Sequence, residues 1–151
     1  MATISHSLDI EAPAERVWGL TLDIERWPTF FPTVTSVVRA DEGPMRVGSA
    51  ARIKQPGQPV RLWTVTECEA PRRFTWETTG LGLSMRAMHV ITPSGRGRVT
   101  NTLTIEIDGP LGRVLGALVR SRIQDVLRLE NEGFRAVAES AVCDDARTIP
   151  A

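Results

Sequence analysis

Polar and apolar residues alternate in the first ten positions of the chain. One face of residues 4–10 carries small polar or acidic side chains, and the opposite face carries Ile4, His6, Leu8 and Ile10. A period of two is typical of a strand with one buried face, so this segment is predicted to be a strand that turns His6 inward. Pro13 follows at a favourable position for the start of a helix, which is predicted to reach about residue 22.

Short strands and turns are predicted for the middle of the chain. Residues 27–32 come first, and two prolines, Pro28 and Pro32, bracket a second, very short helix there. From residue 34 to residue 107, apolar runs are separated by turn signals at 41–44, 55–57, 70–71, 80–82 and 93–95. Strands joined by such turns pair as antiparallel hairpins, which predicts six further strands.

After Gly109-Pro110 the apolar residues recur at steps of three and four. The recurring positions are Leu111, Leu115, Leu118 or Val119, Ile123, Val126 or Leu127, Phe134 and Val137. This spacing predicts one long amphipathic helix that lies on an apolar surface along its length. The predicted fold class is therefore α+β, with a curved seven-stranded antiparallel sheet around a long C-terminal helix and two short helices after the first strand. A sheet too curved to meet a straight helix everywhere leaves space between the two.

The bulk properties indicate one small domain. A chain of 151 residues is long enough to bury a core, and we assign residues 1–140 to a single domain and expect residues 141–151 to form a frayed tail. The 18 basic and 18 acidic residues cancel, which argues against nucleic acid as a partner. No apolar stretch approaches the ~20 residues that span a bilayer, and the first ten residues do not resemble a secretory signal.

Several motifs that carry chemistry are missing from the sequence. Cys68 and Cys143 are far apart and belong to no CxxC pair, so neither a disulfide framework nor a metal site is expected. There is no GxSxG, no GxxxxGK[ST], no GxGxxG after a strand and no HExxH, and no cofactor is expected. The chain has no tyrosine, so chemistry that relies on a phenol is unavailable. We expect a cytoplasmic protein that is a monomer or homodimer.

The order of elements and several short segments together resemble a known superfamily. The segments are Ile10-Glu11-Ala12-Pro13 with Val17-Trp18, Trp27-Pro28, Lys54-Gln55-Pro56-Gly57, Trp63 to Glu67, Phe74-Thr75-Trp76, Ala87-Met88-His89 and Gly109-Pro110-Leu111. Over about residues 3–140 the chain resembles the START-like (SRPBCC) superfamily, and in particular its bacterial polyketide cyclase/dehydrase-like members. The resemblance implies a helix-grip domain with a deep, mostly hydrophobic cavity between sheet and C-terminal helix. Because this superfamily includes lipid carriers, hormone receptors and aromatase/cyclases, the resemblance does not imply one function.

His89 is the main candidate for chemistry. Alternation with Ala87 and Ile91 turns it to the buried face, where a neutral imidazole can accept or donate a proton near neutral pH. The resemblance also matches it to a histidine that this subgroup often shows before the turn proline. A core histidine satisfied by one neighbour fits the same pattern. His6 and Asn101 also point inward and would form one polar spot with His89 if the strands bring them together.

Other residues are expected to line the cavity. Glu130 interrupts the apolar stripe of the long helix, and an ion pair with an arginine is expected there in preference to an acid–base role. Trp63 and Trp76 are candidates for stacking on a flat ligand, and Met85 shares the inward parity of His89. The predicted ligand-binding residues are His6, Trp63, Trp76, Met85, His89, Asn101, Ile123, Leu127 and Glu130.

Three functions remain open from the sequence. The first is a binding module for a hydrophobic small molecule such as a lipid, polyketide or aromatic metabolite. The second is a cofactor-independent polyketide cyclase or dehydratase that uses His89 to move protons. The third is a regulatory or stress-response interaction domain, which an exposed apolar patch would favour.

Overall fold

The computed structural model describes the backbone of residues 1–147 and the side chains of residues 1–140. Its elements follow the order predicted from the sequence. The strands are β1 (Ala2–Ile10), β2 (Ser36–Arg39), β3 (Ala50–Lys54), β4 (Arg61–Glu69), β5 (Arg73–Gly80), β6 (Leu83–Gly95) and β7 (Arg98–Asp108). The helices are α1 (Ala14–Leu22), the 3-10 turn η1 (Ile24–Arg26), α2 (Trp27–Phe30) and α3 (Gly112–Arg147).

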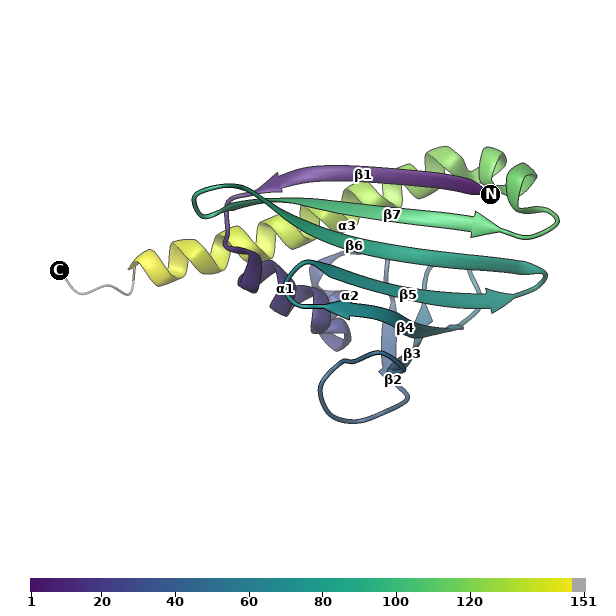
Figure 1. Ribbon diagram of the computed structural model, residues 1–151, viewed down its shortest axis with the longest axis horizontal. Helices are drawn as coiled ribbons and strands as arrows, with labels where there is room; N and C mark the ends of the chain where they lie inside the picture. The colour runs from purple at the N-terminus through teal and green to yellow at the C-terminus, as the bar shows by residue number, and fades with distance from the viewer. Residues whose placement is uncertain (148–151) are drawn as a thin grey trace.

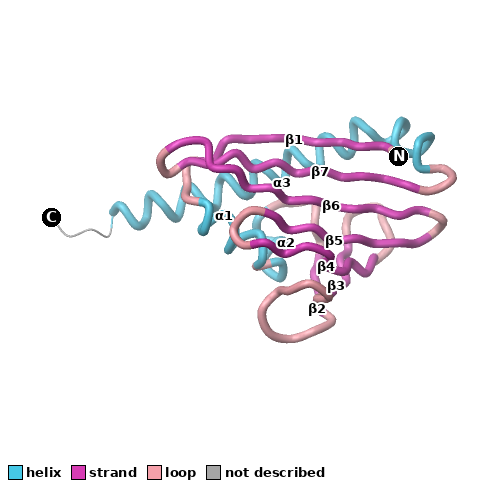
Figure 2. The backbone as a smooth tube through the Cα atoms, viewed as in Figure 1, coloured by secondary structure: helices cyan, strands magenta, loops and turns pink. Residues whose placement is uncertain are grey.

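The seven strands form one antiparallel sheet in the order β1-β7-β6-β5-β4-β3-β2. In Figure 1, β1, β7 and β6 run along the long axis of the molecule, whereas β2 and β3 cross it steeply. Figure 2 shows the same change of direction in the magenta strands. The sheet is therefore strongly curved, as the accumulated twist of many strands predicts.

The helices cover the inner face of this curved sheet. Helix α3 packs against β1 and β7, α1 packs against α3 and β6, and α2 packs against α3 and β2. Two glycines let α3 approach its neighbours closely. A Cβ atom at Gly116 would lie 2.4 Å from the Ala2 Cβ atom, and one at Gly133 would lie 2.5 Å from the Phe30 carbonyl oxygen. These contacts fix where α3 meets the start of β1 and the end of α2.

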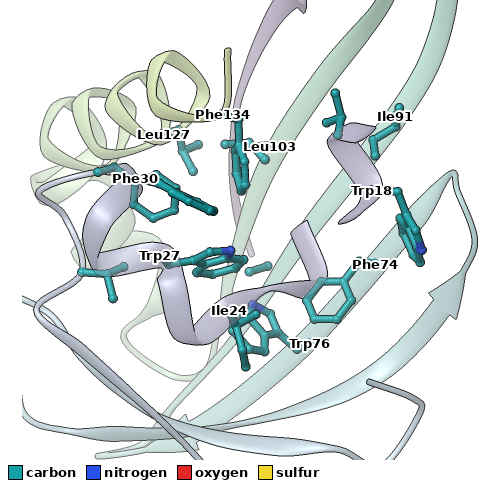
Figure 3. Close-up of a cluster of buried hydrophobic side chains, with 14 of the residues drawn as sticks. Trp18, Ile24, Trp27, Phe30, Phe74, Trp76, Ile91, Leu103, Leu127 and Phe134 are labelled. Atoms are coloured by element: carbon teal, nitrogen blue, oxygen red, sulfur yellow. The ribbon is translucent and has the colours of Figure 1, made fainter. Parts of the chain in front are cut away.

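Aromatic side chains fill the core beside α1 and α2. Phe74 on β5 and Phe134 on α3 are fully buried. In Figure 3, Trp27 lies with Phe134 on one side and Trp76 on the other. The Trp27 ring centroid is 5.3 Å from that of Trp76 and 6.0 Å from that of Phe134, and both pairs meet edge to face. Such pairs stabilise a core by about 0.5–1.5 kcal/mol each beyond the burial of their area.

The predicted fold class is confirmed: the protein is an α+β domain with a seven-stranded antiparallel sheet, two short helices after the first strand and a long C-terminal helix packed on the sheet. No helix among the described residues is both long and apolar enough to cross a membrane.

Two details of the predicted helix differ from the structure. Helix α3 continues through residues 141–147, where a frayed tail was expected, because this segment holds neither proline nor glycine to stop a helix. The remaining predicted tail, residues 148–151, lies outside the described residues. Leu111 does not lie on an apolar surface but is 60% exposed, because it precedes the first residue of α3. Of the predicted alternatives Leu118 and Val119, it is Val119 that faces the cavity, whereas Leu118 is 75% exposed.

Candidate functional site

A cavity of about 660 Å³ lies between α3 and the inner face of the sheet. Its walls are mainly apolar. The sheet contributes Ile53, Leu83, Met85, Ala87, Ile105 and Ile107, and α3 contributes Leu115, Val119, Ile123, Val126, Leu127 and Leu129. Small-molecule sites in proteins typically enclose roughly 300–1,000 Å³ and have mostly hydrophobic linings, so this cavity has the size and the surface of a ligand site.

Three tryptophans form an aromatic wall. Trp63 from β4 and Trp76 from β5 have ring centroids 5.6 Å apart and planes tilted by 36°, and Trp27 meets Trp76 at 5.3 Å. All three rings line the cavity and are at most 6% exposed. Rigid, buried rings of this kind offer a large contact area to a flat ligand at little cost in side-chain entropy.

His89 lies on the cavity wall next to these rings, and its own ring is only 4% exposed. Its ring centroid is 5.5 Å from that of Trp27, 5.7 Å from that of Phe74 and 6.0 Å from that of Phe134. Burial among apolar rings lowers the pKa of His89 to about 4, so the imidazole is neutral at pH 7. Its Nδ1 atom is buried and has no hydrogen-bond partner among the described residues. The structure therefore leaves one nitrogen of a neutral imidazole on the cavity wall without a hydrogen bond.

Glu130 is placed on the cavity wall by α3. Its Oε1 atom accepts a hydrogen bond of 3.2 Å from the Thr33 hydroxyl, which lies between α2 and β2. The expected ion pair is not present: no arginine forms a salt bridge with Glu130 in the described part of the chain. Desolvation raises the pKa of Glu130 to about 7, and the Thr33 hydrogen bond opposes this rise only in part. Its protonation is therefore poised near neutral pH.

Arginines and a loop border the remaining side of the cavity. Arg61, at the start of β4, and Arg122, on α3, both line it. Neither forms an ion pair with another described residue, and the Arg61 Nε atom is buried without a hydrogen-bond partner. The connection between β3 and β4 contributes residues 55–59, which are mostly exposed. This loop therefore forms the part of the cavity lining that is most exposed to solvent.

His6 and Asn101 are held away from the cavity by a third polar residue. Asn131 of α3 is fully buried, and its Nδ2 atom lies 2.9 Å from His6 Nδ1, while its Oδ1 atom accepts a hydrogen bond of 2.8 Å from Asn101 Nδ2. Asn131 Nδ2 also donates to the His6 carbonyl oxygen at 3.0 Å. This trio joins α3 to β1 and β7. His6 and His89 are both paired with Leu103, on opposite sides of it, so β7 separates them.

Seven of the nine predicted ligand-binding residues line the cavity. They are Trp63, Trp76, Met85, His89, Ile123, Leu127 and Glu130. Strand and helix periodicity identified these positions because each lies inside a regular element. Sequence reasoning missed Trp27, Thr33, Arg61 and Arg122. Trp27 was visible as one of four tryptophans, but nothing in the local pattern places α2, or the segment between α2 and β2 that carries Thr33, against α3.

The comparisons with known proteins agree with this architecture. Residues 1–139 match the family described as polyketide cyclase / dehydrase and lipid transport. The chain is 26% identical over 141 residues to Toxin Rv0910 of Mycobacterium tuberculosis, covering 85% of this chain and 94% of the toxin.

Solved structures show the same fold at low sequence identity. A START superfamily protein from Mycobacterium smegmatis superposes with a TM-score of 0.77 at 16% identity, over 93% of this chain and 99% of that one. The ZhuI aromatase/cyclase from Streptomyces sp. R1128 superposes with a TM-score of 0.66 at 19% identity, over 89% of this chain and 94% of that one. The resemblance to the START-like superfamily is confirmed, and the chain belongs to its polyketide cyclase/dehydrase and lipid transport family.

Proposed function

We propose that the protein binds a hydrophobic small molecule, such as a lipid, a polyketide or an aromatic metabolite, in the cavity between the sheet and α3. The observation that carries this proposal is an apolar space of about 660 Å³ next to an aromatic wall. Protein interiors are otherwise packed as densely as organic crystals, and side chains that line an empty space forfeit dispersion contacts. A ligand of matching size restores those contacts and removes its own apolar surface from water.

Filling the cavity tests this function directly. Met85 and Met88 lie on the same strand with opposite parity, and only Met85 lines the cavity. Met85→Trp is expected to weaken binding of the neutral fluorescent probe N-phenyl-1-naphthylamine by at least about tenfold, because the larger ring occupies the ligand's space. Met88→Trp makes the same change on the outer face and is the matched control. An equal loss of affinity for the probe in both variants, or no loss of affinity in either, contradicts binding in this cavity.

Catalysis is the second candidate, and the polar groups on the cavity wall favour it. Glu130 has a pKa of about 7, where a general acid–base residue works best at neutral pH, and His89 lies on the wall of the same cavity. From the sequence, His89, helped by His6 or Asn101, was the expected acid–base group of a cofactor-independent cyclase or dehydratase. Glu130 was expected to form an ion pair in preference to such a role. With a pKa of about 4, His89 suits hydrogen bonding to a carbonyl better than proton abstraction, so Glu130 is the stronger candidate base.

One experiment distinguishes the two candidate functions, ligand binding alone and catalysis. Wild type, Glu130→Gln and His89→Phe are incubated with an aromatic poly-β-keto analogue, and both binding and turnover are measured. Loss of turnover with retained binding in Glu130→Gln supports catalysis. Binding without turnover in all three proteins supports the carrier.

A further inference from the structure

Glu130 is the only acidic residue among the described residues that line the cavity. It interrupts an apolar stripe of α3, with Leu127 one turn before it and Phe134 one turn after it. Thr33 supplies its only hydrogen bond, to Oε1 at 3.2 Å, and Oε2 bonds no described group. One oxygen of the carboxyl group is thus fixed, and the other is left for a partner from within the cavity.

The protein supplies no charge partner for this carboxyl group. The other ionisable groups on the cavity wall are Arg61 on β4, Arg122 on α3 and His89 on β6. His89 is neutral at pH 7, and neither arginine forms an ion pair with Glu130 among the described residues. A desolvated carboxyl group with an unfilled hydrogen bond costs stability even where, as for Glu130, part of it lines a cavity. An apolar residue at this position would continue the stripe without that cost. An acidic residue at a helix position where the pattern favours an apolar one tends to lie at a functional site.

The charged groups on the cavity wall limit which kind of ligand group can bond the Glu130 Oε2 atom. The Glu130 carboxyl group needs a hydrogen-bond donor, which an anionic headgroup does not carry. A cationic amine carries donors but would face the like charges of Arg61 and Arg122 on the same wall. A neutral hydroxyl group meets neither difficulty and donates the hydrogen bond that Oε2 lacks. We propose that Glu130, oriented by Thr33, is the anchor for a hydroxyl group, so that the cavity selects neutral, hydroxyl-bearing apolar molecules. This inference rests on the proposed ligand-binding function.

A matched pair of probes tests the inference, 2-naphthol and its methyl ether 2-methoxynaphthalene. They share the same rings, but only the naphthol has a donor. At pH 8 the wild type is expected to bind the naphthol about tenfold more tightly or better, as hydrogen bonds to charged groups suggest. The preference should shrink toward pH 6, because protonation of Glu130 leaves a weaker acceptor. Glu130→Leu should bind both probes within about twofold of each other.

Glu132→Leu is the matched control, because Glu132 lies on the same helix, bonds Arg128 and does not line the cavity. It should keep the full preference for 2-naphthol. Equal binding of both probes by the wild type would overturn the hydroxyl anchor and leave cavity binding intact. Tighter binding of 2-naphthoate than of 2-naphthol would overturn it in favour of the two arginines. Binding of none of the probes would contradict the proposed function itself, and the inference with it.

Discussion

Gly133 of α3 stands against the Phe30 carbonyl group at the end of α2, so closely that a Cβ atom would lie 2.5 Å from the oxygen and 2.8 Å from Phe31 Cδ1. The missing side chain lets the short helix dock on the long one. Trp27 begins this short helix and Thr33 follows it, and both line the cavity. The contact at Gly133 therefore positions two residues of the ligand site that the sequence pattern did not identify.

Gly133→Ala is predicted to destabilise the protein by about 1–3 kcal/mol, because the added methyl group forces α2 and α3 apart. Gly19→Ala in α1 is the matched control. Its Cβ atom would meet nothing within 4 Å, and alanine favours a helix over glycine, so a gain of about 0.5–1 kcal/mol is expected. Urea unfolding of both variants measures the two changes. A Gly133→Ala protein as stable as Gly19→Ala would show that the helices do not meet here.

The pH dependence of stability should report the desolvated carboxyl group of Glu130, which is half-buried on the cavity wall. Its pKa rises from 4.5 to about 7 on folding. Its contribution to the free energy of unfolding is therefore fully present below pH 4.5 and is lost as the pH rises through 7. At pH 8 this loss amounts to about 3 kcal/mol. Glu130→Gln removes the titration, and its gain over wild type should grow between pH 5 and pH 8. A constant difference across this window, measured by urea unfolding, would place Glu130 in water.

The contribution of His89 to the free energy of unfolding should have the opposite pH dependence, and it should appear at acidic pH. Its pKa falls from 6.5 to about 4 on folding, so its contribution is present above pH 6.5 and is lost as the pH falls toward 4. His89→Phe keeps an aromatic ring among Trp27, Phe74 and Phe134 and cannot titrate. Thermal melts of the two proteins should therefore diverge between pH 6.5 and pH 4, with the wild type losing more stability. Parallel melting curves over this range would be incompatible with a buried neutral imidazole.

The polar trio around Asn131 should matter for stability and not for ligand binding. Asn131→Leu leaves the buried Asn101 amide without its partner, and a loss of about 2–4 kcal/mol is predicted. Neither Asn101 nor Asn131 lines the cavity, so affinity for N-phenyl-1-naphthylamine should stay within about twofold of wild type. A large loss of affinity in the folded variant would instead support the predicted ligand-binding role of Asn101.

Much of the fold was predictable because its signals are local. Alternation in 4–10 and in the strands that carry His89 and Asn101 fixed which side chains face inward, and the three-to-four spacing after Gly109 identified α3. Strand parity could not show that Asn101 bonds Asn131, because the register between a strand and a distant helix leaves no local signature. Strand order has no local signature either: His6 on β1 and His89 on β6 share an inner face without meeting, because Leu103 on β7 lies between them.

The candidate site was predictable only in part. Periodicity placed Glu130 near the inner face of α3, but burial and charge pairing depend on neighbours from other elements. The expected arginine partner is replaced by Thr33, from the connection between α2 and β2, a segment without periodicity. The exposure of Leu111 was also hidden, because the apolar spacing begins one residue before α3 itself.

Thermal unfolding in the presence of ligands tests the central claim most directly. The purified protein is melted with a panel of fatty acids, sterols, flavonoids and aromatic polyketides, alongside Met85→Trp. A ligand at a hundred times its dissociation constant adds about 2.7 kcal/mol, which raises the melting temperature of a domain this size by roughly 5–11 °C. The account predicts a shift of this size for one chemical class in the wild type and a shift about half as large or smaller in Met85→Trp, whose affinity is at least about tenfold lower. The same shift in both proteins, or none with any class, would contradict binding in the cavity between the sheet and α3.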